Sequence, residues 1–229
     1  MLALPALITE DHKSIFYGNI LEITGETVDS FSKYITLPCI LCNDANAAGF
    51  AEIWERKDIE NAFYISLSNN IGGSVLIGNK VYFGEHQRSG EIGHITIIPD
   101  GKPCYCGQKG CVETYCAATI LSDSTNGSLD EFFDYLKKGK SKQIKLWEEY
   151  IYYLSIAVNN LRMLFDCDVI LGGYVGTYMD EYLDDLKKLT AKRNTFENNA
   201  DYLRVCKYKK DAIAAGAALP FIDNFLNNM

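Results

Sequence analysis

Four side chains that can bind a metal lie within one short stretch, GEIGHITIIPDGKPCYCGQKGCVE, which covers residues 90–113. Thiolate and imidazole groups suit a tetrahedral zinc ion, and a zinc ion with four protein ligands has no open position for chemistry. The alternative is a turn-rich loop in which the cysteines are incidental. The spacing favours a structural zinc site, whose predicted ligands are His94, Cys104, Cys106 and Cys111.

Two glutamates flank these four donors. Glu91 lies three residues before His94, and Glu113 lies two residues after Cys111. A carboxylate can accept hydrogen bonds from two hydroxyl groups, and its charge strengthens both of them. The alternative is a solvated surface acid or, for Glu113, a favourable charge near the start of a helix.

The pair Asn43-Asp44 lies where a predicted buried strand (residues 38–42) meets a predicted helix (residues 45–55). Both side chains are of the types that cap a helix by accepting a hydrogen bond from one of its first backbone N–H groups. Capping does not exclude a second role in binding a ligand, and the residues alone leave both roles open.

The pattern G-E-x-G-H followed by C-x-C-G-x-x-G-C-x-E closely resembles the signature of the ROK family (repressors, open reading frames and sugar kinases), and every fixed position is present. The resemblance implies that the histidine and the three cysteines hold zinc. It also implies that Asp44, in a kinase, takes the proton from the hydroxyl that attacks the γ-phosphate of ATP. The implied sugar contacts are Asn43, Asp44, Glu91 and Glu113.

The nucleotide-binding elements of that family are absent or altered in this sequence. No D-x-G-G-T phosphate hairpin occurs, and the usual turn Gly-Thr-Gly-Ile-Gly-Gly reads SNNIGG at residues 68–73. Glycines let backbone N–H groups approach a phosphate closely, whereas asparagine side chains would crowd that approach. A second glycine turn reads VILGGY at residues 169–174, where a plain strand-to-helix turn is an equal alternative. The remaining candidates for nucleotide binding are Gly72, Gly73, Gly172 and Gly173.

The elements that must position these residues alternate between strands and helices, which indicates an α/β protein. The clearest is a helix from Ser141, with an apolar stripe at alternating spacings of three and four residues from Ile144 to Phe165. Other predicted helices cover residues 28–34, 179–192 and 212–225 or start at Val112 and Leu129, and predicted strands cover residues 63–67, 74–77, 81–83, 95–98, 169–171 and 202–206.

The resemblance implies the actin-like, ribonuclease-H-like fold of the family, in which two lobes form an ATPase-type architecture. The small N-terminal lobe would be incomplete, with residues 1–43 and 212–229 as its remnant. Residues 44–211 would form the large lobe, including the zinc loop at residues 94–111.

Composition limits the classes of function. The chain has 229 residues and a formal net charge of −8, with a pI near 4.9. Because a phosphate backbone would be repelled, this chain alone is a poor nucleic-acid binder. No apolar run reaches the roughly 18 residues of a membrane span, and the start lacks the basic residues of a signal peptide. The eight cysteines in so large and apolar a chain favour a reducing, cytoplasmic location over a disulfide scaffold.

The sugar and zinc residues are present while the nucleotide residues are lost or altered, a pattern that favours a sugar sensor. The sequence therefore predicts the effector-binding body of a transcriptional regulator, which senses a hexose or an N-acetylhexosamine and has no or little kinase activity. An N-terminal helix-turn-helix outside this sequence would bind DNA, and the resemblance implies a homodimer. The first alternative is an ATP-dependent sugar kinase, which would need ATP and Mg²⁺. The second is a zinc-stapled module without a ligand.

Overall fold

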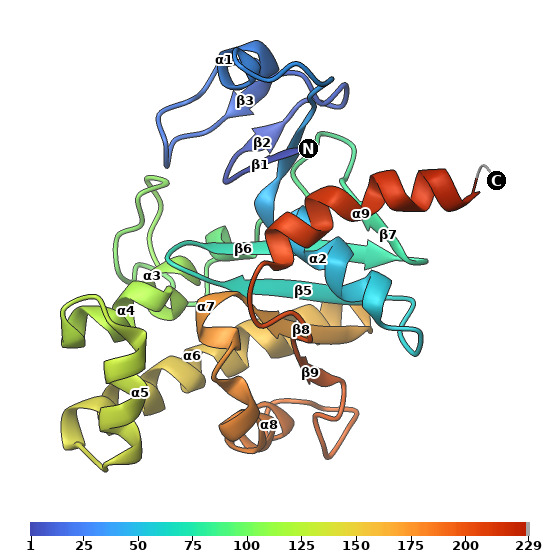
Figure 1. Ribbon diagram of the computed structural model, residues 1–229. Coiled ribbons are helices and arrows are strands. Elements are labelled where there is room, and N and C mark those ends of the chain that lie inside the picture. Colours follow the sequence, from blue (N-terminus) through green and yellow to red (C-terminus); the bar gives the residue numbers. More distant parts are fainter. Residues whose placement is uncertain (228–229) are drawn as a thin grey trace. The chain divides into compact units, whose positions relative to one another are not determined.

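The computed structural model describes residues 1–227 and shows an α/β chain (Figure 1). Its contacts divide the chain into two compact units. Unit 1 contains Met1–Tyr64, Ser74–Gly90 and the residues from Asp211 onward, and unit 2 contains Ile65–Gly73 and Glu91–Lys210. None of the helices in the described part of the chain is long and apolar enough to cross a lipid bilayer.

A mixed five-stranded sheet has the strand order β7-β6-β5-β8-β9 (Figure 1). Strands β6 and β7 pair antiparallel, and strands β8 and β9 pair parallel. Gly78 and Asn79, with φ of 57° and 62°, form the left-handed turn that a two-residue hairpin favours. The strands are β5 (Ala62–Leu67), β6 (Ile71–Ile77), β7 (Lys80–Tyr82), β8 (Asp168–Gly172) and β9 (Leu203–Val205).

In unit 2 the long helix α6 (Ser141–Phe165) packs against helix α8 (Leu183–Ala191) and strand β8. The predicted helix is confirmed, and its stripe from Trp147 to Leu161 is buried. Phe165 is 40 % exposed because the helix ends there, at a left-handed Asp166. The remaining helical segments of this unit are η1 (Ile92–His94), α3 (Glu113–Cys116), α4 (Ala118–Ser122), η2 (Asp123–Thr125), α5 (Leu129–Lys137), α7 (Gly173–Gly176) and η3 (Met179–Glu181).

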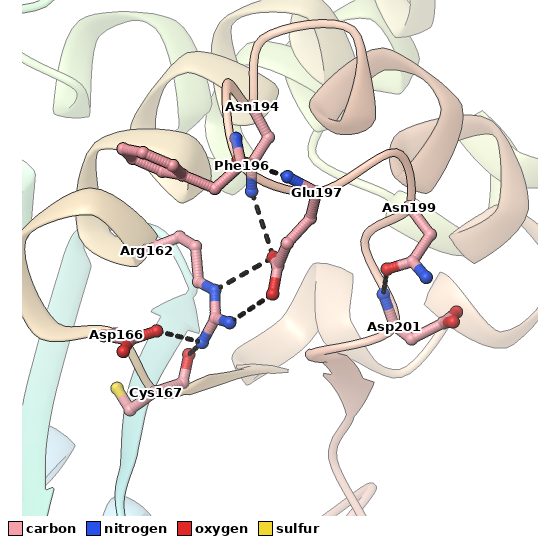
Figure 2. A network of polar contacts seen from close by, with 8 residues as sticks. All are labelled: Arg162, Asp166, Cys167, Asn194, Phe196, Glu197, Asn199 and Asp201. Carbon is pink, nitrogen blue, oxygen red and sulfur yellow. Dashed lines mark hydrogen bonds and ion pairs between the residues drawn. The ribbon is translucent and has the colours of Figure 1, made fainter.

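An arginine on α6 holds the connection between α8 and β9 in place (Figure 2). Arg162 donates through Nε and Nη2 to the two carboxylate oxygens of Glu197, at 3.2 and 2.5 Å. Its Nη1 lies 3.1 Å from an Asp166 oxygen. Asn194 closes the turn by accepting hydrogen bonds from the backbone N–H groups of Phe196 and Glu197. A planar guanidinium suits this two-pronged contact, so a loop without regular structure has one defined conformation.

Unit 1 combines helix α2 (Asp44–Glu55), helix α9 (Ala212–Asn227) and short strands. Helix α9 packs closely on α2, because a Cβ on Gly216 would overlap the backbone carbonyl of Ala47. Strands β1 (Leu2–Leu4) and β4 (Leu41–Asn43) pair parallel, and β2 (Leu7–Ile8) and β3 (Ile15–Tyr17) pair antiparallel. A small core of Ala6, Ile8, Ile15 and Leu41 lies beside them, partly covered from the short helix α1 (Val28–Ser32).

Two predicted elements are wrong. Residues 95–98 form no strand, and only an isolated bridge pairs Thr96 with Cys111. The backbone N–H groups of Ile97 and Ile98 both donate to the Gly110 carbonyl, so this β-branched run closes a loop instead of joining the sheet. The predicted helix at 179–192 breaks at Tyr182, which separates η3 from α8.

The two units do not correspond one to one with the two predicted lobes. Residues 44–64 and 74–90 were expected in the large lobe, but they belong to unit 1. The packing of α2 on α9 accounts for the difference, because it joins the helix after Asn43 to the end of the chain. The lobe boundary after residue 43 stays a prediction.

Candidate functional site

The four predicted metal ligands come together in unit 2. One ligand atom from each of His94, Cys104, Cys106 and Cys111 lies within 4.8 Å of the other three. Cys104 and Cys111 are buried, and His94 and Cys106 are half-buried. Burial lowers the pKa of His94, so an uncharged imidazole is favoured, which is the form that binds a metal.

The spacing of these atoms fits a tetrahedral zinc ion. Zinc–sulfur bonds of about 2.3 Å place two sulfur ligands roughly 3.8 Å apart in a tetrahedron. The Sγ atoms of Cys106 and Cys111 are 3.7 Å apart, and the Cys104 Sγ lies 3.9 Å from His94 Nδ1. The geometry therefore suits a closed metal site with Nδ1 as the imidazole donor, while the identity of the metal stays a prediction.

Glycines and one tyrosine shape the loop around the cluster. A Cβ on Gly110 would overlap the Ile98 carbonyl, so only glycine permits the loop to close there. Tyr115, on α3, is buried and accepts a 2.9 Å hydrogen bond from the Lys102 backbone N–H group. The loop is thus attached to the helix that also carries Glu113.

Glu113 is a buried carboxylate that the protein holds on both oxygens. It is only 6 % exposed. The side-chain amide of Asn70 donates to Oε1 at 3.0 Å, and the Ile71 backbone N–H group donates to Oε2 at 2.7 Å. Burial raises the pKa of the Glu113 carboxyl, and these two hydrogen bonds oppose the increase. Each oxygen keeps one further lone pair that can accept a hydrogen bond from a hydroxyl group.

Glu91 is exposed and immediately precedes the 3-10 helix η1. It belongs to the same unit as Glu113. Gly93 within η1 packs directly against Glu113, because a Cβ added to it would lie 3.3 Å from Glu113 Oε2. The G-E-x-G-H segment therefore needs glycine at its fourth position to approach Glu113.

Asn43 and Asp44 lie in unit 1, at the start of α2. The expected cap is present, since Asn43 Oδ1 accepts a 2.9 Å hydrogen bond from the Asn46 backbone N–H group. Asn43 Nδ2 donates to the Ala6 carbonyl at 3.1 Å. Asp44 Oδ1 accepts from the Ala45 backbone N–H group at 2.8 Å, and burial raises the pKa of its carboxyl. A carboxylate with a raised pKa is a better proton acceptor than an ordinary aspartate.

Three of the four glycines predicted for nucleotide binding lie on two strands of the sheet, and the fourth, Gly173, begins helix α7. Gly72 and Gly73 are inside β6, and Gly172 ends β8. Gly173 has φ of +73°, and a Cβ there would lie 2.6 Å from the Leu67 backbone nitrogen. Close packing on β5 is thus enough to require glycine at position 173, whether or not a nucleotide binds.

Sequence reasoning missed two residues that touch the predicted site. Asn70 was considered only as an obstacle to a phosphate, yet its side chain holds Glu113. The Tyr105 hydroxyl lies 3.4 Å from His94 Nε2, the nitrogen opposite the metal-facing one. Neither contact has a signal in the sequence, because each depends on segments that the fold brings together.

Comparison with known proteins identifies the family. A model described as "ROK family" matches residues 1–223, and the chain belongs to this family. It is 29% identical over 212 residues to a glucokinase of Halalkalibacterium halodurans, covering 82% of this chain and 64% of that protein. It is 32% identical over 155 residues to an N-acetylmannosamine kinase of Yersinia pestis, covering 65% of this chain and 53% of that protein. The chain thus spans less than two thirds of the length of these curated relatives.

Solved structures show the same fold. A ROK hexokinase from Thermus thermophilus superimposes with a TM-score of 0.79 at 28% identity, covering 97% of this chain and 78% of that one. A ROK family transcriptional regulator, a homologue of the E. coli MLC protein, has a TM-score of 0.75 at 20% identity, covering 94% of this chain and 60% of that one. The predicted α/β class and family are confirmed, and the fold occurs in both kinases and regulators.

Proposed function

We propose that this protein binds a hexose or an N-acetylhexosamine and belongs to the kinase branch of its family. The observation that supports this most is the placement of Asp44, half-buried in the first turn of α2, where burial raises the pKa of its carboxyl and suits it to accept a proton. The curated relatives described above are kinases of glucose-type and N-acetylhexosamine substrates, which supports the same reading. In this proposal Asn43, Asp44, Glu91 and Glu113 bind the sugar hydroxyl groups.

The reaction would transfer the γ-phosphoryl group of ATP to one hydroxyl of the sugar. Asp44 accepts the proton of that hydroxyl while its oxygen bonds to the γ-phosphorus, and the bond from this phosphorus to the bridging oxygen breaks to leave ADP. Positioning and charge stabilisation account for most of the acceleration in such transfers. Gly72, Gly73, Gly172 and Gly173 are the residues proposed to lie near the nucleotide, and Mg²⁺ would accompany ATP.

The metal serves the sugar residues by fixing the loop that carries them. Zinc held by His94 and the three cysteines would lock the segment between Glu91 and Glu113. The pair of glutamates would then have a constant separation, which lowers the entropy that must be lost on binding. In this proposal the metal takes no part in the phosphoryl transfer.

A coupled assay for ADP release and calorimetry test the proposal together. Glucose, mannose, N-acetylglucosamine and N-acetylmannosamine are each titrated into the zinc-loaded protein with and without Mg²⁺ and ATP. Saturable binding of one sugar together with its phosphorylation supports the kinase. Absence of binding by all four sugars contradicts the proposed function, and phosphorylation that persists unchanged in Asp44→Asn contradicts the role of Asp44.

The sensor is the second candidate, and one observation favours it. In the 68–73 turn, which resembles the glycine-rich nucleotide turn of the family, Asn70 points its amide to Glu113. If Asn70 contacts the proposed sugar-binding carboxylate instead of a phosphate, the protein would bind a sugar without using ATP. Sugar binding that is unaffected by ATP, with no ADP release, would support this candidate. The homodimer, the cytoplasmic location and a DNA-binding segment outside this sequence stay predictions.

A further inference from the structure

Two consecutive residues hold the Glu113 carboxylate, Asn70 at the end of the turn between β5 and β6 and Ile71 as the first residue of β6. The Asn70 side chain donates to Oε1 at 3.0 Å, and the Ile71 backbone donates to Oε2 at 2.7 Å. The two segments are 43 residues apart along the chain. The second contact needs only a backbone, but the first exists because the residue at position 70 is an asparagine. The glycine of the resembled turn has no side chain with which to make it.

The segment η1 packs beside the Oε2 end of the carboxylate, next to Ile71. An ideal Cβ on Gly93 would lie 3.3 Å from Glu113 Oε2 and 2.5 Å from the Ile71 carbonyl oxygen. Even the smallest side chain at this position would therefore displace its neighbours. Glu113 thus has little room to adopt another rotamer, and three separate segments of unit 2 determine where its oxygens lie.

Two hydrogen bonds leave an ionised carboxylate with unused capacity. Its two oxygens offer about four lone-pair sites, and the protein donors occupy one on each oxygen. We propose that Asn70 is a positioning residue, which holds Glu113 Oε1 so that the remaining lone pairs of the carboxylate face two hydroxyl groups of the sugar. This inference rests on the proposed sugar binding, and it assigns to Asn70 a role in affinity that the phosphate-binding pattern does not include.

The size of the effect follows from the type of bond. A hydrogen bond to a charged group is stronger than one between two neutral groups, so its loss should be measurable as a change in affinity. Removing the amide of Asn70 leaves Glu113 with one protein donor and more rotational freedom. We expect Asn70→Ala to weaken sugar binding about tenfold or more.

The test is calorimetry on zinc-loaded full-length variants with the sugar that binds the wild-type protein. Asn70→Ala removes the donor, and Asn70→Asp keeps the shape of the side chain but places a second carboxylate beside Glu113. Asn69→Ala is the matched control, because Asn69 is exposed in the same turn. Each variant is also measured for zinc content and for its melting temperature.

The expected order of affinity is wild type and Asn69→Ala together, then Asn70→Ala, then Asn70→Asp, with zinc content unchanged. A purely conformational role for the turn would not make the Asp variant, which keeps the shape, weaker than the Ala variant. Equal affinities of wild type and Asn70→Ala would overturn the inference while leaving sugar binding established. A wild-type protein that binds none of the four sugars would overturn the proposed function and this inference with it.

Discussion

The cysteine loop (residues 94–111) and the segment 68–73 both lie in unit 2, yet their side chains make different kinds of contact. In the loop, four donor groups converge until their ligand atoms lie within 4.8 Å of one another. In the turn, residues that stand in place of glycines direct one amide to a carboxylate 43 residues away. The donor groups of the loop lie against one another, whereas the side chain of Asn70 contacts a residue outside its own segment.

This difference indicates a structural role for the cysteine loop and a ligand-binding role for the segment 68–73. The metal site proposed at the loop would be closed, because four protein ligands would complete the coordination of a tetrahedral ion. The Glu113 carboxylate can still accept further hydrogen bonds, because each of its oxygens keeps a lone pair. A change in the loop should therefore disturb the fold first, and a change in the turn should disturb ligand binding first.

The largest expected effect comes from breaking the metal cluster. Cys111→Ser removes a buried ligand, and we expect complete loss of stoichiometric zinc together with a fall in melting temperature of roughly 10 °C or more, since structural zinc contributes a large part of the folding free energy of such sites. Metal content by mass spectrometry and thermal unfolding measure the two effects.

Cys39→Ser is the matched control for that substitution. Cys39 is half-buried, lies outside the cluster, and its Sγ donates to the Leu37 carbonyl at 3.4 Å. It should retain both zinc and stability. A Cys111→Ser protein with a full complement of zinc would show that the loop is not a four-ligand site.

The second prediction asks whether catalysis survives the altered turn. If the protein is a kinase, Asp44→Asn should lower kcat by about 10²–10⁴-fold, because general base catalysis contributes that much. Sugar affinity should change far less, since the amide keeps an acceptor for Ala45. ADP release and calorimetry on the same preparation separate the two. A variant with wild-type kcat would assign the base elsewhere.

The same substitution makes a prediction about stability. Burial raises the pKa of Asp44 above its ordinary value of 3.8, so the folded state binds the proton more tightly than the unfolded state. Stability is therefore lost as the pH rises from the ordinary pKa of 3.8 to the raised pKa of the folded state, and the full loss is present above it. Asp44→Asn should unfold at higher urea concentration than the wild type at neutral pH, and the difference should shrink on acidification.

The third prediction concerns Gly93, where the loop segment meets the turn. A methyl group at this position would lie 2.5 Å from the Ile71 carbonyl oxygen, so Gly93→Ala should lower the free energy of unfolding by about 1–3 kcal/mol, the usual cost of overpacking. Urea denaturation measures it, with Thr96→Ala at an exposed position as the control. A neutral Gly93→Ala would show that the two regions are less tightly packed.

The smallest effect should come from restoring the glycine-rich pattern of the turn. The triple variant Ser68→Gly, Asn69→Thr, Asn70→Gly frees backbone N–H groups to approach a phosphate and removes the donor to Glu113. We expect ATP affinity to rise about tenfold and sugar affinity to fall about tenfold. Titrations with each ligand measure both, and unchanged ATP affinity would show that the turn does not limit nucleotide binding.

Much of the architecture follows from local pattern. The stripe on α6 predicted a long helix because its apolar residues repeat with the helical period, and that helix extends over Ser141–Phe165. The run at residues 95–98 misled the same reasoning, because β-branched residues favour strands while this segment gives its N–H groups to Gly110. Periodicity identifies which residues are apolar together, but it does not reveal which backbone partner a short segment will find.

The sequence by itself determined the family and the four donor side chains that come together in the loop, because donor types at fixed spacing within one loop need little help from the rest of the chain. Only the tertiary structure showed the contact of Asn70 with Glu113 and the need for glycine at position 93. Both depend on segments far apart in the chain that meet at Glu113, and a hydrogen bond of 3.0 Å requires a placement that composition and periodicity do not specify. The donor types of one loop can be predicted from sequence, whereas the direction in which a side chain points depends on the tertiary fold.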